Sequence, residues 1–146
     1  MNSLPIIEKK NPKVSIGIPT FNRPAGLKNT LECLTNQSYT NIEIIISDNG
    51  SPTDEVSKVA AEFTNLDTRV KFYGHSENRG AAFNFKFVLQ KAEGDYFMWA
   101  ADDDWWDAKF VESIISLILK TPSSIAGFCN YSIVNEANLN QKYTDP

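Results

Sequence analysis

The sequence predicts an α/β fold in which helices cover both faces of a parallel sheet. Short runs rich in β-branched residues alternate along the chain with segments whose apolar residues recur at helical spacing. Strands that alternate with helices form parallel sheets, because each helix returns the chain to the start of the next strand. The 146 residues are the length of one domain, and the 42% that are hydrophobic can form a sizeable core.

Five runs predict the strands. They are VSIGI (14–18), IEIIIS (42–47), VKFY (70–73), YFMWA (96–100) and IAGFCNYSI (125–133). Pro19 is expected to end the first strand, because proline has no N–H to donate within a sheet. The second run is apolar at nearly every position, which is typical of a central parallel strand buried on both faces.

Four segments between these strands predict helices. They lie at about 24–36, 53–65, 81–92 and 108–120. In the first, leucines recur at i, i+4 and i+7 from Leu27, and Pro24 suits a first helical turn. In the third, Phe85, Val88 and Leu89 are expected to share the buried face. The predicted element order is therefore βαβαβαβαβ.

Composition narrows the domain organisation and the class of partner. Residues 1–12 predict an irregular lead-in, and residues 13–146 predict one domain. The net charge of −4, with no basic block, argues against a nucleic-acid partner. The two cysteines lie far apart without metal-ligand spacing, and no signal-peptide or membrane-length apolar run is present, so a cytoplasmic protein with reduced thiols is expected.

Polar segments follow three of the predicted strands. They are PTFNR (19–23), SDNGSPTD (47–54) and ADDDWWD (101–107). The carboxyl ends of parallel strands lie along one edge of the sheet, and ligands bind there where the strand order switches. The three segments are therefore expected to lie together on one rim.

Asp102 and Asp103 are the candidate metal ligands on this rim. Mg²⁺ and Mn²⁺ take oxygen ligands, with one or two carboxylates completed by water and substrate phosphates. The alternative is a solvated turn in which an aspartate caps the following helix. That alternative stays open above all for Asp104 and Asp107.

The other two loops offer groups that suit a nucleotide. Asp48 can accept an N–H from a base edge, or it can close a simple turn with the following Asn and Gly. Phe21 can stack on a base and Arg23 can face phosphates, although a plain connection capped by Asn22 accounts for the same residues. His75 has no partner motif and is interpreted as a surface residue.

A further loop, NRGAA (78–82), offers Arg79 as a cation, Asn78 as a helix cap and Gly80 for close approach of a ligand.

Several other site classes are excluded by their missing motifs. The chain has no GxGxxG, GxxxxGK[ST], GxSxG or HExxH sequence.

Four of these motifs together resemble the nucleotide-sugar half of the family-2 glycosyltransferases. They are VSIGIPTFNR, IEIIISDNGSPTDE, NRGAAFN and GDYFMWAADDDWW, which occur in the family's order from about Val14 to at least Phe128. The resemblance implies a Rossmann-like GT-A three-layer fold, mostly parallel, and an enzyme that transfers sugar from a nucleotide-diphosphate sugar. It also implies a metal that bridges the diphosphate, Mg²⁺ or Mn²⁺.

The resemblance implies a role for each matching position. The implied nucleotide-sugar site consists of Pro19, Thr20, Phe21, Asn22, Arg23, Asp48, Asn78, Arg79, Gly80, Asp102 and Asp103. Asp48 matches the residue that hydrogen-bonds a uracil or thymine, which favours UDP- or dTDP-sugars. Asp103, with Asp102 beside it, matches the end of the DxD-type motif and is the better metal ligand.

The sequence departs from the family pattern in two ways. Ala101 stands where many relatives have the first aspartate of the motif. The general base of these commonly inverting enzymes lies in the acceptor half, which is expected beyond Pro146, so no catalytic base is assigned and the chain is interpreted as the donor-binding portion, truncated before the acceptor half.

Two other function classes stay open: a non-catalytic module that binds nucleotide sugars and, less well matched to the glycine-poor first loop, a nucleotidyltransferase. Similar enzymes usually serve cell-surface polysaccharide synthesis, with a glycan or lipid-linked acceptor. They work at the cytoplasmic membrane face, where the full enzyme can associate peripherally, although nothing in these residues indicates a membrane.

Overall fold

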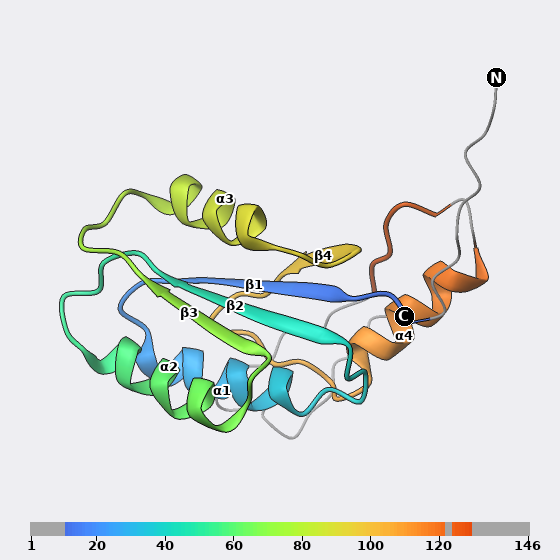
Figure 1. Ribbon diagram of the computed structural model, residues 1–146, viewed down its shortest axis with the longest axis horizontal. Coiled ribbons are helices and arrows are strands. Elements are labelled where there is room, and N and C mark those ends of the chain that lie inside the picture. Colours follow the sequence, from blue (N-terminus) through green and yellow to red (C-terminus); the bar gives the residue numbers. More distant parts are fainter. Residues whose placement is uncertain (1–10, 122–123, 130–146) are drawn as a thin grey trace, which may run out of the picture.

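The computed structural model describes residues 11–121 and 124–129, in which strands and helices alternate along the chain (Figure 1). The strands are β1 (Val14–Thr20), β2 (Ile42–Asp48), β3 (Val70–Gly74) and β4 (Tyr96–Trp99). The helices are α1 (Pro24–Thr35), α2 (Glu55–Leu66), α3 (Ala81–Lys91) and α4 (Phe110–Lys120). Each expected helix is present, with ends within two residues of their predicted positions.

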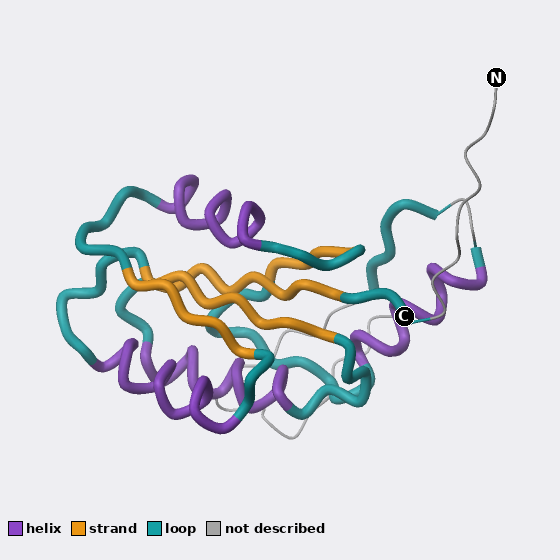
Figure 2. The backbone as a smooth tube through the Cα atoms, viewed as in Figure 1, coloured by secondary structure: helices purple, strands orange, loops and turns teal. Residues whose placement is uncertain are grey.

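The four strands form one parallel sheet in the order β3-β2-β1-β4 (Figure 2). Helices α1 and α2 lie on one face of the sheet and α3 lies on the other, which gives three layers (Figure 1). The chain builds outward from β1 to β3 and then crosses back to add β4 on the other side of β1. The predicted α/β class is therefore confirmed, and the switch in strand order falls between β1 and β4.

The central strands are buried because helices cover both of their faces. Every residue of β1 and of β2 is buried. One face of each strand carries branched apolar side chains that join the main core with leucines of α1 and with residues of α4. These strand residues are Val14, Ile16, Ile18, Ile42, Ile44 and Ile46. Because β2 is buried on both faces, its sequence is a nearly continuous apolar run.

The first strand continues past the predicted end at Pro19. The carbonyl of Gly17 accepts a hydrogen bond from the N–H of Ala100 on the β4 side. Backbone groups alternate sides along a strand, so the nitrogen of Pro19 points in the same direction, beyond the end of β4. Since no ladder partner is needed there, proline is tolerated and β1 extends to Thr20.

Two further expectations are wrong in part. Residues 125–129 form no strand, and the rest of the predicted fifth strand lies outside the described residues. Ile125 and Phe128 are 95% and 92% exposed, so neither side chain belongs to the core. In α3 the buried stripe is Asn84 and Val88, whereas Phe85 is almost half exposed.

In the part of the chain that is described, no helix has the length and apolarity needed to cross a membrane.

Candidate functional site

The segments that follow β1, β2 and β4 meet at the carboxyl edge of the sheet, as predicted. Thr20 and Asp48, the last residues of β1 and β2, are register partners. The hydroxyl of Thr20 donates to Asp102 Oδ2 over 2.7 Å, which ties the end of β1 to the loop after β4. This edge is the switch point of the sheet, where open α/β folds bind ligands.

Asp102 and Asp103 share the guanidinium of Arg23. Arg23 Nη1 lies 3.4 Å from Asp102 Oδ1 and is hydrogen-bonded to Asp103 Oδ2. The charge of Asp102 and the hydrogen bond to Asp103 raise the pKa of Arg23. Asp102 is buried, whereas the Asp103 side chain is 56% exposed. Asp102 is therefore fixed by the protein, and Asp103 is the carboxylate that a ligand can reach.

Two residues of helix α1 contact the backbone of the loop at residues 101–104. Gly26 packs directly against the carbonyl of Asp102, where a Cβ would collide with the backbone. The buried hydroxyl of Thr30 lies 3.2 Å from the carbonyl oxygen of Ala101 and 3.1 Å from that of Asp104. These contacts set the backbone that carries the candidate metal ligands.

Neither Asp104 nor Asp107 caps α4. The helix begins at Phe110 without a side-chain cap, and Asp107 Oδ1 accepts the N–H of Lys109 within the preceding turn. Burial, and then repulsion from its two neighbouring aspartates, raises the pKa of Asp104. The capping alternative is therefore wrong for both residues, and Asp107 serves a local turn.

Asp48 has one carboxylate oxygen held and one open. Its Oδ1 accepts the hydroxyl and the N–H of Ser51, at 2.5 and 3.2 Å. No hydrogen bond to Oδ2 occurs among the described residues. The turn expected as the alternative is thus present, and it leaves Oδ2 of this buried residue without a described donor. The Ser51 hydroxyl also accepts the N–H of Asn22, which has a φ of 55°.

The loop at residues 78–80 is bound to the β2 loop by Asn49. The amide of this buried residue donates to Asn78 Oδ1 (2.9 Å) and to the carbonyl of Gly80 (3.2 Å), and it accepts the N–H of Arg79 (3.0 Å). Gly50, at φ 73°, allows the two loops to touch. Asn78 is therefore occupied within the protein, and it is not the cap of α3, whose N-cap is Gly80.

Phe21 and Arg79 present their side chains at the same rim. The Phe21 ring is 41% exposed, so it offers a face for stacking. The guanidinium of Arg79 lies 3.8 Å from the centre of the Phe83 ring. A cation held in this way is oriented without its charge being neutralised.

Asn84 is a buried polar residue of this edge that the sequence prediction missed. Its Nδ2 donates to the carbonyls of Thr20 (3.1 Å) and Ser47 (3.0 Å), and its Oδ1 accepts the Ser47 hydroxyl (2.6 Å). It thereby clamps the carboxyl ends of β1 and β2. The signal was available, because Asn84 stands four residues before buried Val88 on the same helical face.

His75 is not the surface residue without a partner that the sequence suggested. Its Nε2 lies 3.0 Å from the Ser47 hydroxyl, and its ring packs edge-on against Phe83 and Phe87. The imidazole therefore helps to fill the junction of β2, β3 and α3.

A divalent cation fits two carboxylates of this rim. No group of three or more His, Cys, Asp or Glu side chains that could hold a metal ion occurs within residues 11–121 and 124–129. The guanidinium of Arg23 nevertheless contacts Asp102 and Asp103 together, so one positive charge reaches both. Such a pair is what a hard cation takes when phosphates and water complete its shell.

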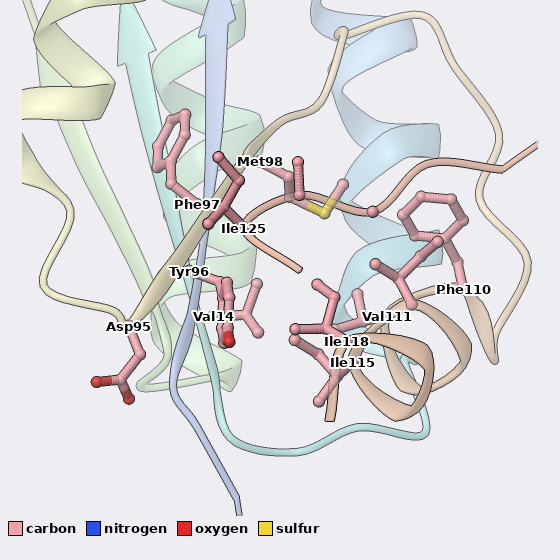
Figure 3. Close-up of a pocket in the computed structure, with 13 residues that line it drawn as sticks. Val14, Asp95, Tyr96, Phe97, Met98, Phe110, Val111, Ile115, Ile118 and Ile125 are labelled. Carbon is pink, nitrogen blue, oxygen red and sulfur yellow. The ribbon is translucent and has the colours of Figure 1, made fainter. Parts of the chain in front are cut away.

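A separate cavity of about 310 Å³ lies between β4 and α4 (Figure 3). It is lined largely by apolar side chains, among them Tyr96, Met98, Phe110 and Ile118. None of the predicted nucleotide-binding residues lines it. The cavity lies within the apolar packing around β4, apart from the polar rim.

Known proteins match this chain in both sequence and fold. The family model for glycosyl transferase family 2 matches residues 15–145. A curated relative from Escherichia coli, the UDP-Glc:alpha-D-GlcNAc-diphosphoundecaprenol beta-1,3-glucosyltransferase WfgD, is 30% identical over 91% of this chain and 51% of its own length. Another curated relative, the Glycosyltransferase GlyA from Streptococcus pneumoniae serotype 4, is 30% identical over 86% of this chain and 18% of its own length, so the chain spans only part of these proteins.

Solved glycosyltransferase structures share the fold. Residues 1–349 of S. aureus TarS in complex with UDP-GlcNAc align with a TM-score of 0.69 and 20% identity, over 74% of this chain and 31% of that one. The mannosyltransferase PcManGT from Pyrobaculum calidifontis, in complex with GDP-Man and Mn²⁺, aligns with a TM-score of 0.67 and 20% identity, over 81% and 34%. The expected GT-A fold is confirmed, and the chain belongs to glycosyl transferase family 2.

Proposed function

We propose that this chain is the donor-binding part of a glycosyltransferase, which binds a nucleotide-diphosphate sugar together with Mg²⁺ or Mn²⁺. The observation that carries the proposal is the meeting of three loops at the switch point, with Asp48, Arg23 and the pair Asp102–Asp103 on one rim. Family membership supports the same activity, since family-2 relatives are named as glycosyltransferases.

The β2 end of the rim suits the nucleoside. Asp48 keeps Oδ2 free of described donors, so it can accept an N–H from a pyrimidine base. The exposed ring of Phe21 can stack on that base. A uracil- or thymine-containing donor is therefore proposed, and a guanine-containing donor is the competing case because PcManGT is in complex with GDP-Man.

The β4 end suits the diphosphate. Asp103 is the exposed ligand for the cation, and Asp102 is held beside it by Thr20. A divalent cation there would stabilise the negative charge of the departing nucleoside diphosphate. Arg23 and Arg79 add positive charge at the same edge, and both guanidinium groups can donate to phosphate oxygens.

Calorimetric titration with UDP, dTDP and GDP, each with and without Mn²⁺, tests the proposal. Binding of at least one of these, strengthened by Mn²⁺, is expected. If none binds in either condition, the assignment of a donor site is wrong. Release of free UDP from a UDP-sugar distinguishes a transferase from a module that only binds the donor.

The acceptor and the stereochemistry are proposed here only as classes. WfgD is named for a diphosphoundecaprenol-linked acceptor. For the present chain we propose the coarser class, a glycan or lipid-linked acceptor in polysaccharide or glycoconjugate synthesis, with inversion and with a catalytic base outside these residues. Assay of the full enzyme on lipid-linked sugars tests this assignment.

A further inference from the structure

We propose that Arg23 is the built-in counter-ion of the metal-binding carboxylates, and that an incoming divalent cation must displace it. This inference rests on the proposed donor site and adds a competition to it. Before the donor binds, one guanidinium holds Asp102 and Asp103 together. When the cation and the diphosphate arrive, the guanidinium leaves the carboxylates and pairs with phosphate oxygens.

Arg23 occupies the space between the two carboxylates that would hold the cation. Arg23 Nη1 contacts one oxygen of Asp102 and one oxygen of Asp103. The other oxygen of Asp102 already accepts the Thr20 hydroxyl, so Asp102 Oδ1 is the oxygen of that residue without another described partner. A cation held by both carboxylates would meet the like charge of the guanidinium there, so the two would compete for the pair.

Arg23 is free to leave. Its side chain is 56% exposed, and the ion pair with Asp103, itself 56% exposed, faces solvent. It precedes α1 as the N-cap residue and makes no side-chain capping bond that would hold it in place. Its described partners are these two carboxylates, so its departure breaks no other contact. The diphosphate expected beside the cation offers the displaced charge a new partner.

The competition predicts both the size and the direction of a change in Mn²⁺ affinity. An ion pair between exposed groups is worth up to about 1 kcal/mol, which is about fivefold in an equilibrium constant. Removing the guanidinium should therefore tighten Mn²⁺ binding without nucleotide by about two- to fivefold. With UDP present the advantage should vanish or reverse, because the wild-type arginine then gains the phosphates and by linkage stops opposing the metal.

Mn²⁺ titrations of the whole chain, followed by water-proton relaxation, test the competition without any assay of activity. The variants are Arg23→Gln, Arg23→Lys and, as a matched control, Lys28→Gln, which removes one positive charge from an exposed side chain of α1 that pairs with Glu62. Arg23→Gln is expected to bind Mn²⁺ two- to fivefold more tightly than wild type. Arg23→Lys should fall between them, and Lys28→Gln should match wild type.

Other outcomes overturn the inference, and they do so in distinguishable ways. Equal Mn²⁺ affinity in wild type and Arg23→Gln means that Arg23 does not compete, while the donor site itself stands. Weaker binding in Arg23→Gln means that the arginine positions the carboxylates for the metal. If no Mn²⁺ binds to any variant although UDP binds, the metal assignment falls together with the inference. If UDP also fails to bind, the proposed function falls as well.

Discussion

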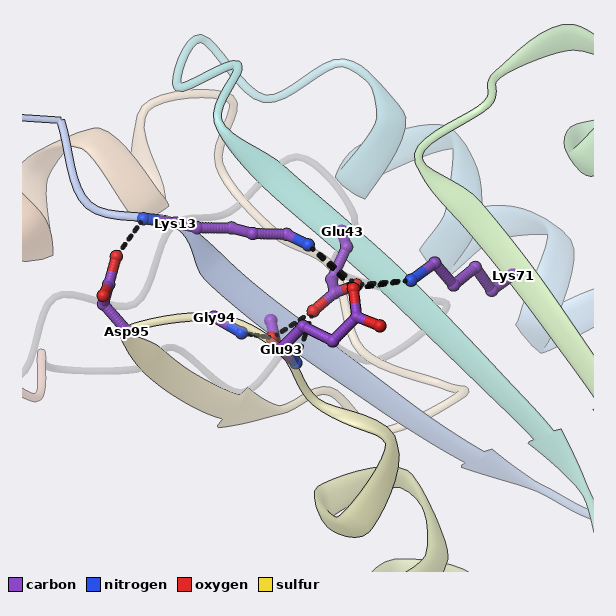
Figure 4. Close-up of polar contacts among 7 residues, drawn as sticks. Lys13, Glu43, Lys71, Glu93, Gly94 and Asp95 are labelled. Atoms are coloured by element: carbon purple, nitrogen blue, oxygen red, sulfur yellow. Dashed lines mark hydrogen bonds and ion pairs between the residues drawn. The ribbon is translucent and has the colours of Figure 1, made fainter.

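The two ends of the sheet each carry a cluster of carboxylates, and the clusters differ in how completely they are satisfied. At the amino end, Glu43 is almost fully buried, and both of its oxygens are occupied (Figure 4). Oε1 accepts the Ser15 hydroxyl at 2.6 Å and the N–H of Glu93 at 2.8 Å. Oε2 pairs with Lys71 at 2.9 Å and Lys13 at 3.1 Å.

At the carboxyl end the charges are not balanced. Two lysines face Glu43 and Glu93 at the amino end, whereas one arginine faces Asp102 and Asp103. A carboxylate whose lone pairs and charge are used within the fold contributes to stability, because its desolvation is repaid. A pair left short of positive charge at a strand end has capacity for a ligand. The two clusters therefore differ in how far their carboxylate oxygens and charges already have partners within the protein.

Truncation of Glu43 should give the largest effect on stability. Glu43→Ala removes the buried carboxylate shared by Lys13, Lys71, the Ser15 hydroxyl and the N–H of Glu93, and the loss of these bonds should cost on the order of 3 kcal/mol. Urea unfolding followed by tryptophan fluorescence measures the loss. Glu93→Ala is the matched control, because Glu93 contacts the same lysines but is 65% exposed, and its loss should stay under about 1 kcal/mol. Equal losses would remove the distinction between the clusters.

Acid should destabilise the protein through the same residue. Burial alone would raise the pKa of Glu43, but hydrogen bonds from Ser15, Lys71 and the Glu93 N–H outweigh it and lower the pKa from 4.5 to about 2. The unfolded chain therefore binds the proton more readily, so stability present above about pH 4.5 is lost as the pH falls toward 2. The loss is on the order of 3 kcal/mol. Glu43→Gln should lack this part of the pH dependence; an unchanged acid profile would contradict it.

Asn84 connects stability to the candidate site, and its replacement should affect both. Asn84→Leu removes three buried hydrogen bonds, those with the Ser47 hydroxyl and with the carbonyls of Thr20 and Ser47, which costs about 2 kcal/mol of unfolding free energy. It should also weaken UDP binding, because Thr20 then loses the clamp that orients its hydroxyl toward Asp102. Lys86→Ala, at an exposed position of the same helix, is the control. A stability loss with UDP affinity intact would limit Asn84 to a structural role.

Asp103→Asn should reduce the effect of Mn²⁺ on UDP binding and leave the free energy of unfolding unchanged. Its exposed carboxylate holds no buried group, so urea unfolding should match wild type. The strengthening of UDP binding by Mn²⁺ should fall at least about tenfold. Asp104→Asn is the matched control, since Asp104 is the neighbouring carboxylate and does not contact Arg23. Similar losses in both variants would show a general charge effect in place of a specific metal ligand.

Asp48→Asn is expected to have the smallest effect. The amide oxygen can keep the bonds from Ser51, but the group that replaces Oδ2 now donates and cannot accept a base N–H. A fivefold weakening of UDP binding, about 1 kcal/mol, is expected, with GDP affinity less affected. Parallel titrations of the two nucleotides measure it. If both nucleotides weaken equally, Asp48 does not read the base.

The sequence was sufficient for the elements that have a clear period or a sharp change in polarity. Alternation of strands and helices predicted the parallel sheet, and polar segments after apolar runs predicted which loops meet at the rim. The chemistry of the side chains suggested candidate roles for these loops, and the family resemblance assigned a role to each matching position. The strand prediction for residues 125–129 was wrong because an apolar run fits an irregular segment beside apolar side chains as well as a strand. Residues 125–127 line the cavity between β4 and α4 and do not pair with the open edge of β4.

Contacts between distant segments could not be predicted from local pattern. That Thr20 points inward to Asp102, and that Asn78 is occupied by Asn49, depends on the sheet order and on the length of each loop. The role of Asn84 could not be predicted for the same reason. A polar residue on an apolar stripe is visible in the sequence, but the carbonyls that it satisfies come from two other strands.

Ser51 has a consequence for how the proposed donor would be bound. Its hydroxyl donates to Asp48 and accepts the N–H of Asn22, the residue immediately before Arg23. The two ends of the rim that are proposed for the nucleoside and for the phosphates are therefore joined by hydrogen bonds. Because each fragment would order one end of this link, uridine and inorganic pyrophosphate should each tighten the binding of the other.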